Sequence, residues 1–247
     1  MLKKTALVTG SGARIGKGIA IRLAEDGFNV VVNGSKDEAA CQSVVSEIEA
    51  NGGSAHVCMA DIGQRSDIDR LIDSTHKHFG PVHVLVNNAA IRPSAPFLDE
   101  DMAVWDKVMD VNFHSAVWLA RGLLPDMIQA NWGRIIHFTG MNAQKGYVGK
   151  TAVSVSKHAL WGLTKSLCVE HGRDGVTCNM ISPGTFPGDD VVIDSGGSFE
   201  QLRLGNPSGR LGKSRDIAGL VSYLCSDDGG FMSGQMLQVN GGVVTQV

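Results

Sequence analysis

A glycine-rich stretch near the start of the chain has the composition of a phosphate-binding turn. It reads Thr9-Gly10-Ser11-Gly12-Ala13-Arg14-Ile15-Gly16 and lies between a short apolar run and an amphipathic segment. Glycines between a strand and a helix let backbone N–H groups and the helix N-terminus face a pyrophosphate. Because both flanking elements are predicted, a nucleotide-binding turn is favoured over a structural one, with Gly10, Ser11, Ile15 and Gly16 at the nucleotide.

Arg14, Ser35 and Lys36 favour a nucleotide that carries a 2′-phosphate. The second predicted strand ends in Asn33-Gly34-Ser35-Lys36, without the acid that would accept a hydrogen bond from an adenosine ribose 2′-hydroxyl. Asp37 follows too late for that role. Because a phosphate needs a cation, these residues favour NADP(H) over NAD(H).

Short β-branched runs alternate with helix-length amphipathic segments and predict repeated βα units around a parallel sheet. About seven strands are expected, at Ala6–Thr9, Val30–Asn33, Ala55–Met59, Val82–Asn87, Arg134–Phe138, Val176–Ile181 and Met236–Val239. Helices are expected at Ile15–Asp26, Asp37–Asn51, Ser66–Phe79, Asp99–Ala130 with a bend near Asn112, Thr151–Gly172 and Ser214–Ser226. Ser66 and Ser214 are the expected N-caps. The predicted fold class is α/β, a Rossmann-type doubly wound parallel sheet with helices on both faces, in a single domain over residues 1–247.

A long connection rich in glycine and proline follows the sixth predicted strand. It covers residues 184–212 and holds few large apolar side chains. A loop of this length is usually functional or disordered, and ligands bind beyond the carboxyl ends of strands in open α/β sheets. We therefore expect a substrate lid here, with a passive disordered insert as the alternative.

Composition narrows the class of partner. The chain has 247 residues, a formal net charge of −3 and no basic run, which argues against nucleic-acid binding and polybasic membrane-surface binding. Residues 1–10 do not form a secretory h-region, and no stretch approaches a membrane span. The 5 cysteines include no C-x-x-C pair, and the histidines lack metal-ligand spacing. We expect a cytoplasmic protein that acts on a small molecule and has no metal site.

The motifs resemble those of the short-chain dehydrogenase/reductase (SDR) family over nearly the whole chain. The matching pieces are Thr9-Gly10-x-x-x-Arg14-x-Gly16, Asp61-Ile62, Asn87-Asn88-Ala89-Ala90, Asn112, Lys157, Ser182-Pro183-Gly184 and the tail from Ser233 to Gly242. The resemblance implies a doubly wound sheet around a dinucleotide, and carbonyl or alcohol substrates as in 3-oxoacyl-[acyl carrier protein] reductases. The nucleotide contacts that it implies are Asp61 and Ile62 at the adenine, Asn88 and Ala89 on the ribose side, and Pro183 and Gly184 at the nicotinamide.

The catalytic positions depart from the pattern of the family. There, a tyrosine four residues before the lysine transfers the proton, and a serine thirteen residues before that tyrosine orients the carbonyl. Lys157 and Asn112 are present, but the tyrosine position is Val153 and the serine position is Gly140. Neither side chain can move a proton, and such transfer typically contributes about 10²–10⁴-fold in rate.

Few groups are available to replace the missing phenol, because the chain has only 2 tyrosines. Tyr223 is expected in the core, in an apolar helix, which leaves Tyr147 as the candidate proton donor. A packing or surface role for Tyr147 is the alternative. Lys157 is a second candidate if burial lowers its pKa, as opposed to a lysine that only binds ribose hydroxyls.

Three functions remain open. The first is an NADP(H)-binding SDR oxidoreductase that acts on a small carbonyl or alcohol substrate, with proton delivery through Tyr147, Lys157 or water. The second is a catalytically silent subunit that binds nucleotide or pairs with an active relative in a hetero-oligomer. The third is a non-redox enzyme that uses the same pocket. We take the first as the working hypothesis.

The resemblance also implies a homo-oligomer, either a dimer or a tetramer. Members of the family pack through the two long helices, here predicted at Asp99–Ala130 and Thr151–Gly172, and through the C-terminal strands. Trp118, Leu160, Trp161 and Leu167 are candidates for these contacts and equally for the core.

Overall fold

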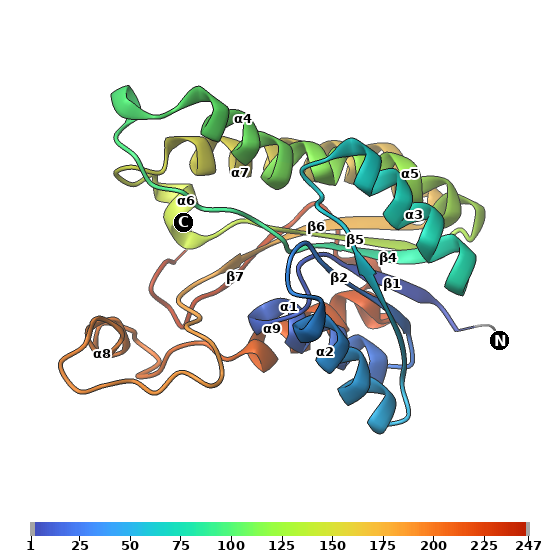
Figure 1. Ribbon diagram of the computed structural model, residues 1–247, viewed down its shortest axis with the longest axis horizontal. Coiled ribbons are helices and arrows are strands. Elements are labelled where there is room, and N and C mark those ends of the chain that lie inside the picture. Colours follow the sequence, from blue (N-terminus) through green and yellow to red (C-terminus); the bar gives the residue numbers. More distant parts are fainter. Residues whose placement is uncertain (1–2, 246–247) are drawn as a thin grey trace.

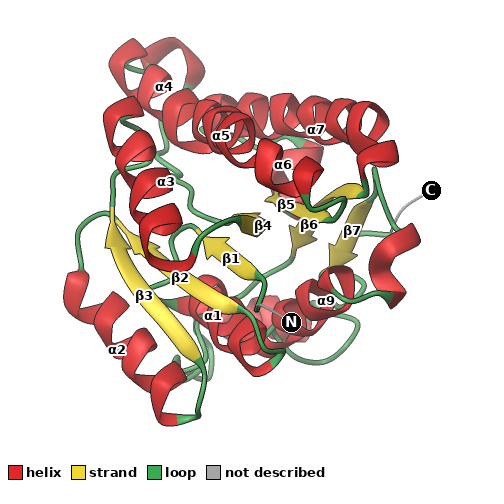
Figure 2. Cartoon of the chain, turned by 90° about the vertical axis from the view of Figure 1, so that its right-hand side faces the viewer, coloured by secondary structure: helices red, strands yellow, loops and turns green. Residues whose placement is uncertain are grey.

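The computed structural model describes residues 3–245 of the chain. In that part of the chain, one sheet of seven parallel strands lies between two layers of helices (Figure 1 and Figure 2). The strands are β1 (Thr5–Val8), β2 (Asn29–Gly34), β3 (Ser54–Met59), β4 (Val82–Asn87), β5 (Gly133–Phe138), β6 (Val176–Pro183) and β7 (Met236–Val239). Their order in the sheet is β3-β2-β1-β4-β5-β6-β7. The predicted doubly wound α/β sheet is confirmed, and every predicted strand is present.

The helices divide between the two faces of the sheet, as Figure 1 shows. One face carries α1 (Arg14–Glu25), α2 (Glu38–Ala50) and α9 (Ser214–Cys225). The other face carries α3 (Arg65–Phe79), α4 (Met102–Met109), α5 (Ser115–Gln129) and α7 (Thr151–His171). A π-helical turn, Asp110–His114, joins α4 to α5, so the long predicted helix is interrupted at Asn112 as expected. Two short helices, α6 (Met141–Lys145) and α8 (Ser198–Leu204), were not predicted because they are too short to show a periodic pattern.

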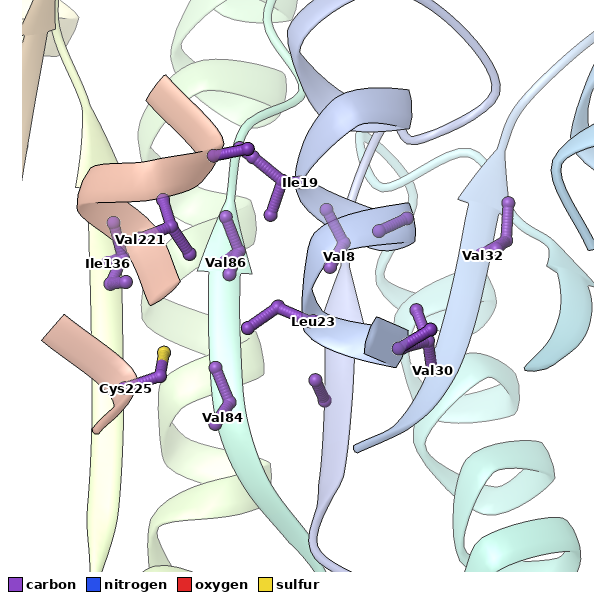
Figure 3. Close-up of a cluster of buried hydrophobic side chains, with 14 of the residues drawn as sticks. Val8, Ile19, Leu23, Val30, Val32, Val84, Val86, Ile136, Val221 and Cys225 are labelled. Atoms are coloured by element: carbon purple, nitrogen blue, oxygen red, sulfur yellow. The ribbon is translucent and has the colours of Figure 1, made fainter. Parts of the chain in front are cut away.

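The core lies on both faces of the sheet, because the central strands bury apolar side chains in both directions. On β1, Ala6 and Val8 contact the layer of α1 and α9, whereas Leu7 contacts the layer of α3 and α5. Figure 3 shows the first of these contacts, where Ile19 and Leu23 of α1 lie against the strands. Burial on both faces gives the continuous valine and isoleucine runs that made the strands predictable.

The two predicted serine N-caps were wrong. Helix α3 starts at Arg65, so Ser66 lies within its first turn. Helix α9 starts at Ser214 itself, and the backbone N–H of this serine donates to the Asp189 carboxylate at 2.9 Å. A carboxylate from a distant loop therefore satisfies a free N–H at the start of α9, which a local sequence pattern does not reveal.

The strand order reverses between β1 and β4. The chain runs from β1 to β2 and β3 on one side, then crosses to β4 and continues to β7 on the other side. The loops after β1 and β4 therefore lead to helices on opposite faces and diverge, which opens a crevice at their carboxyl ends. The predicted nucleotide-binding and catalytic residues should therefore lie at the carboxyl ends of the strands.

Leu123 of α5 provides a test of the core assignment, since its side chain is 0% exposed. Leu123→Ala should lower the free energy of unfolding by about 2–5 kcal/mol, because it removes buried methyl groups and leaves a cavity. Urea denaturation measures the change. Leu98→Ala is the control, because Leu98 is 93% exposed and its loss should change stability by about 0.5 kcal/mol or less. Equal losses in both variants would contradict the assignment.

Candidate functional site

Hydrogen bonds from two side chains join the carboxyl ends of β1 and β4. The Thr9 hydroxyl donates to the carbonyl oxygen of Val86 at 3.3 Å and accepts from the backbone N–H groups of Asn88 and Ala89, each at 3.1 Å. The Asn88 side-chain amide donates back to the carbonyl oxygens of Thr9 at 2.9 Å and Gly10 at 3.0 Å. These bonds fix the spacing of the two loops, so the crevice between them is preformed.

Ser11 supports the glycine-rich turn from beneath. Its hydroxyl donates to the carbonyl oxygen of Val8 at 2.7 Å and accepts from the Asn33 N–H at 3.0 Å. The Asn33 side chain continues the network to the carbonyl oxygens of Cys58 at 3.0 Å and Ala60 at 3.2 Å. Ser11 is fully buried. It therefore ties the turn to β2 and does not line a cavity.

Two glycines let the turn pack closely against Asn88. Gly10 has a φ of +63°, and a Cβ at Gly16 would lie 2.6 Å from Nδ2 of Asn88, closer than real Cβ contacts. Arg14, at the start of α1, has a φ of +51° although it is not glycine. The left-handed region costs a non-glycine residue about 1–2 kcal/mol. Arg14 is exposed and is held in this conformation by the turn.

A cleft of about 550 Å³ lies over the turn. The predicted nucleotide-binding residues that line it are Gly10, Arg14, Ile15, Gly16, Ser35, Lys36, Asp61, Ile62, Asn88 and Ala89. Sequence reasoning missed Arg92, Lys107 and Phe186, which also line it. Asp37 does not line the cleft, because its carboxylate accepts from the Ala40 N–H at 2.9 Å and caps α2. The volume, the close glycines and the basic lining fit a dinucleotide.

A second cavity of about 270 Å³, here called the chamber, adjoins the cleft and shares Ile15, Arg92 and Phe186 with it. The sequence-predicted residues that line the chamber are Gly140, Tyr147, Val153, Lys157, Pro183 and Gly184. They come from the ends of β5 and β6, from α7, and from the loop after α6. The structure thus brings the predicted nicotinamide positions together with Lys157 and Tyr147 of the predicted catalytic residues, but not with Asn112.

Lys157 is the buried cation of the chamber, with a side chain only 4% exposed. Burial, together with the smaller effect of the positive charge of Arg92, lowers the pKa of Lys157 to about 7. Within residues 3–245, its ammonium group has no hydrogen-bond or ion-pair partner. A lysine with this pKa can both hold and release a proton near neutral pH.

His137 is buried under the chamber and stays neutral. Its side chain is 0% exposed, and Nδ1 lies 3.1 Å from Nδ2 of Asn87. Burial and the charge of Lys157 lower the pKa of His137 to about 3. The imidazole therefore carries no charge at physiological pH and packs as a polar core residue.

Asn112 fixes the loop after β4. Its Oδ1 accepts from the Ile91 N–H at 2.9 Å, and its Nδ2 donates to the Ile91 carbonyl at 3.0 Å and to the Ser156 hydroxyl at 3.3 Å. Asn112 is 3% exposed and lines neither cavity. These bonds connect the β4 loop to α7, next to Lys157.

The two tyrosines differ from each other in their surroundings. Tyr147 is 40% exposed and lines the chamber. The expectation that Tyr223 is buried was wrong, because it is 42% exposed and its hydroxyl donates to the Asp228 carbonyl at 3.2 Å. Helix α9 is apolar on more than its buried face, so sequence alone did not show which side Tyr223 occupies.

Gly140 leaves room in the wall of the chamber. It has a φ of −176°, an extended conformation open to any residue. No atom lies within 4 Å of the position where a Cβ would stand. A serine side chain would therefore fit at this position without displacing a neighbour.

The part of the chain that the structure describes offers neither a cluster of metal ligands nor a helix suited to span a membrane. There, no group of three or more His, Cys, Asp or Glu side chains is arranged to hold a metal ion. None of its helices combines the length and the apolar composition that a membrane span requires. The cysteines are all free thiols.

Comparison with known proteins identifies relatives along the whole chain. Residues 11–244 match the family model described as enoyl-(acyl carrier protein) reductase. The 3-oxoacyl-[acyl-carrier-protein] reductase FabG of Staphylococcus epidermidis is 34% identical over 244 residues, covering 98% of this chain and 99% of the relative. A structure from Agrobacterium tumefaciens, of a protein put forward as a gluconate dehydrogenase, superposes with a TM-score of 0.91 at 27% identity, covering 100% of this chain and 98% of the other. A blue fluorescent protein from a metagenomic library, in complex with NADPH, superposes with a TM-score of 0.87 at 31% identity, covering 98% of each chain.

The lowered pKa of Lys157 predicts how stability depends on pH. Between about 7 and the ordinary value of 10.5, the unfolded chain binds more protons at this site than the folded chain. The stability of the wild type relative to Lys157→Met should therefore rise with pH through this window and stay constant below it. Urea denaturation of both proteins without nucleotide, across the pH range, measures the difference. Parallel pH profiles would contradict the assignment.

Proposed function

Because the chain belongs to the short-chain dehydrogenase/reductase family of oxidoreductases, we propose that it is an NADP(H)-dependent enzyme that acts on a small carbonyl or alcohol substrate, with Tyr147 delivering the proton. The observation that carries the proposal is the chamber. Tyr147 and Lys157 line it together with Gly140 and Val153, which occupy the serine and tyrosine positions of the family pattern. The chamber joins the nucleotide cleft through Ile15, Arg92 and Phe186.

The residues of the cleft are suited to hold the dinucleotide. Gly10 and Gly16 line the cleft at the N-terminus of α1, where the pyrophosphate would lie, and Asp61 and Ile62 line the part assigned to the adenine. Pro183 and Gly184 line the chamber at the end of β6, where the nicotinamide is expected. The chemistry that a bound nicotinamide supplies is hydride transfer.

The protein's own groups handle the proton. Val153 and Gly140 offer no side-chain donor, so the Tyr147 hydroxyl is the phenol available to protonate a carbonyl oxygen in the chamber. Lys157 would hold the ribose hydroxyls of the nucleotide. With a pKa of about 7, its ammonium group would return a proton to the phenolate oxygen of Tyr147 after Tyr147 has donated its own. Asn112 acts as a positioning residue, because it fixes the β4 loop beside Lys157.

Preference for NADP(H) over NAD(H) is supported by the charges at the end of β2. Arg14, Ser35 and Lys36 line the cleft. Asp37, the nearest acid in the sequence, is engaged in capping α2. A 2′-phosphate would therefore meet two cations and no competing carboxylate from this turn.

We further propose that residues 184–212 form the substrate lid of a single domain spanning residues 1–247. The segment is fastened at its ends, where Gly184 N–H donates to the Val239 carbonyl at 2.9 Å and Asn206 Nδ2 donates to the Asn240 carbonyl at 3.1 Å. Between these points, α8 stands away from the sheet in Figure 1, and Val192 and Leu204 are exposed. A segment that is anchored at both ends and carries exposed apolar side chains between them can close over the chamber.

Association into a homo-oligomer, a dimer or a tetramer, also belongs to the proposal. Leu160 and Leu167 are core residues, so they are unavailable for contacts between subunits. Trp118 on α5 is 38% exposed and Val169 on α7 is 85% exposed, which supports an interface through these helices.

One observation favours a second candidate, a silent subunit that binds nucleotide and pairs with an active relative in a hetero-oligomer. The chamber lacks both proton-handling side chains of the family pattern at Gly140 and Val153. In that case the cleft would bind nucleotide without turnover.

Purified protein should bind NADPH about tenfold or more tightly than NADH, because a phosphate bound by two cations contributes charge-assisted hydrogen bonds. Arg14→Gln/Lys36→Gln should remove most of that difference while leaving NADH affinity within about twofold. Titration calorimetry measures all four affinities. Equal affinities in the wild type would rule out the phosphate assignment.

Tyr147→Phe should reduce carbonyl reduction by about 10²-fold or more in the wild-type background, because it removes the proton donor. The same substitution should have little effect in the Gly140→Ser/Val153→Tyr variant, which regains the serine and tyrosine of the family pattern. NADPH oxidation with a panel of ketones and 3-oxo esters measures turnover in the four proteins. Wild-type turnover that survives Tyr147→Phe would exclude Tyr147 as donor, and turnover only in the variants with Gly140→Ser/Val153→Tyr would indicate the silent subunit.

A further inference from the structure

The charged side chains that line the chamber are all basic. Two cations, Arg92 and Lys157, line it, and no Asp or Glu lies among the described residues of its wall. Its other polar side chains are neutral, those of Thr139, Asn142, Tyr147 and Thr185. If Lys157 binds ribose hydroxyls, as in the proposed function, Arg92 is the cation left to face a substrate.

The backbone on both sides of Arg92 is held firmly. The Lys150 ammonium donates to the carbonyl oxygens of Arg92 at 2.7 Å and Pro93 at 2.9 Å. On the other side, Asn112 bonds to both the N–H and the carbonyl of Ile91. The loop is therefore fixed from α7 and from the π-helical turn, which positions Arg92 at the mouth between the two cavities.

The guanidinium of Arg92 has no internal anion to satisfy it. In residues 3–245, Arg92 forms no ion pair and no side-chain hydrogen bond, and the side chain is exposed. By contrast, Arg210 in the connection before α9 is neutralised by Asp216, to which it is bidentate at 2.6 and 2.9 Å. An unpaired arginine on a fixed loop in a cavity without carboxylates is suited to bind an external anion.

The nucleotide phosphates are the competing anions, since Arg92 also lines the cleft. The cleft supplies Arg14, Lys36 and Lys107 for those phosphates, and none of these three lines the chamber. Arg92 alone among these cations is shared with the chamber, beside Tyr147 and Gly140. Its position therefore favours the substrate over the cofactor.

We infer that Arg92 is a specificity-determining residue that binds a carboxylate on the substrate, so that the substrate class is small oxo acids and the corresponding hydroxy acids. The inference rests on the proposed function for the location of the substrate. The planar guanidinium matches a carboxylate through two parallel hydrogen bonds, and the chamber of about 270 Å³ sets a small size for the ligand. The carboxylate is bound at the mouth while the carbonyl lies near Tyr147.

Binding to the protein–NADPH complex tests the inference without requiring turnover. Laevulinate and acetoacetate are each compared with their methyl esters, which keep the ketone and lose the charge. The quenching or enhancement of NADPH fluorescence gives each dissociation constant. The acids should bind about 10-fold to 100-fold more tightly than the esters, as expected for a charge-assisted pair.

Variants of Arg92 assign the preference to this side chain. Arg92→Gln should weaken the binding of the acids to the level of the esters and change the dissociation constants of the esters by no more than about twofold. Arg92→Lys should retain part of the preference for the acids. Arg173→Gln is the matched control. It removes the same charge from an exposed position just before β6, at the amino ends of the strands and away from the chamber. It should leave the ratio of acid affinity to ester affinity unchanged.

Each other outcome contradicts a distinct statement. If Arg92→Gln weakens NADPH and preserves the ratio of acid to ester, Arg92 binds the cofactor and the inference is wrong. If dihydroxyacetone phosphate shows the preference over dihydroxyacetone while the carboxylates do not, the anion is a phosphate and the oxo acid class is overturned. If the carboxylate preference is present without turnover of any substrate, the inference stands and the oxidoreductase function fails. If NADPH itself does not bind, the proposed function fails and the inference fails with it.

Discussion

The two cavities depend on the hydrogen bonds between Thr9 and Asn88. At the switch in strand order, β1 and β4 are neighbours whose following loops diverge, so the backbone groups at their ends have no sheet partners. One hydroxyl and one amide satisfy four of these groups and hold the loops at a fixed spacing. The cleft is open because its walls are fastened at the base, and the chamber continues from it.

The surroundings of Lys157 determine the protonation state of its side chain. Its ammonium is buried beside Val153 and Gly140, which offer it neither a hydroxyl nor a charge, and burial is the main cause of its lowered pKa. In the family pattern, the position on the preceding turn of this helix, here Val153, holds a tyrosine that takes part in the proton transfer. Lys157 and Arg92 are the cations of the chamber wall, so the protonation state of Lys157 depends on its burial, on Arg92 and on the ligand that binds between them.

Sequence reasoning predicted the fold and most of the cleft, because both depend on local signals. The strands were readable from buried β-branched runs such as Val30–Val32, and the turn from glycines that tolerate no side chain, such as Gly16. What failed depends on distant contacts. Asp189 satisfies the start of α9 from another loop, and Tyr223 lies on the exposed side of an apolar helix. Arg92 was missed because it follows β4 in a loop whose sequence carries no signal of its own. Only the structure shows that this residue lines both cavities.

The left-handed conformation of Arg14 gives this protein a trade-off between folding and recognition. A glycine would relieve the strain of about 1–2 kcal/mol at this position, at the cost of a flexible backbone in the unfolded chain and the loss of a cation at the cleft. Natural variants that stabilise the fold by this route would lose one of the two cations that we propose for the 2′-phosphate. Because of the strain at Arg14, no single substitution at this residue can both stabilise the fold by relieving the strain and keep the cation at the cleft.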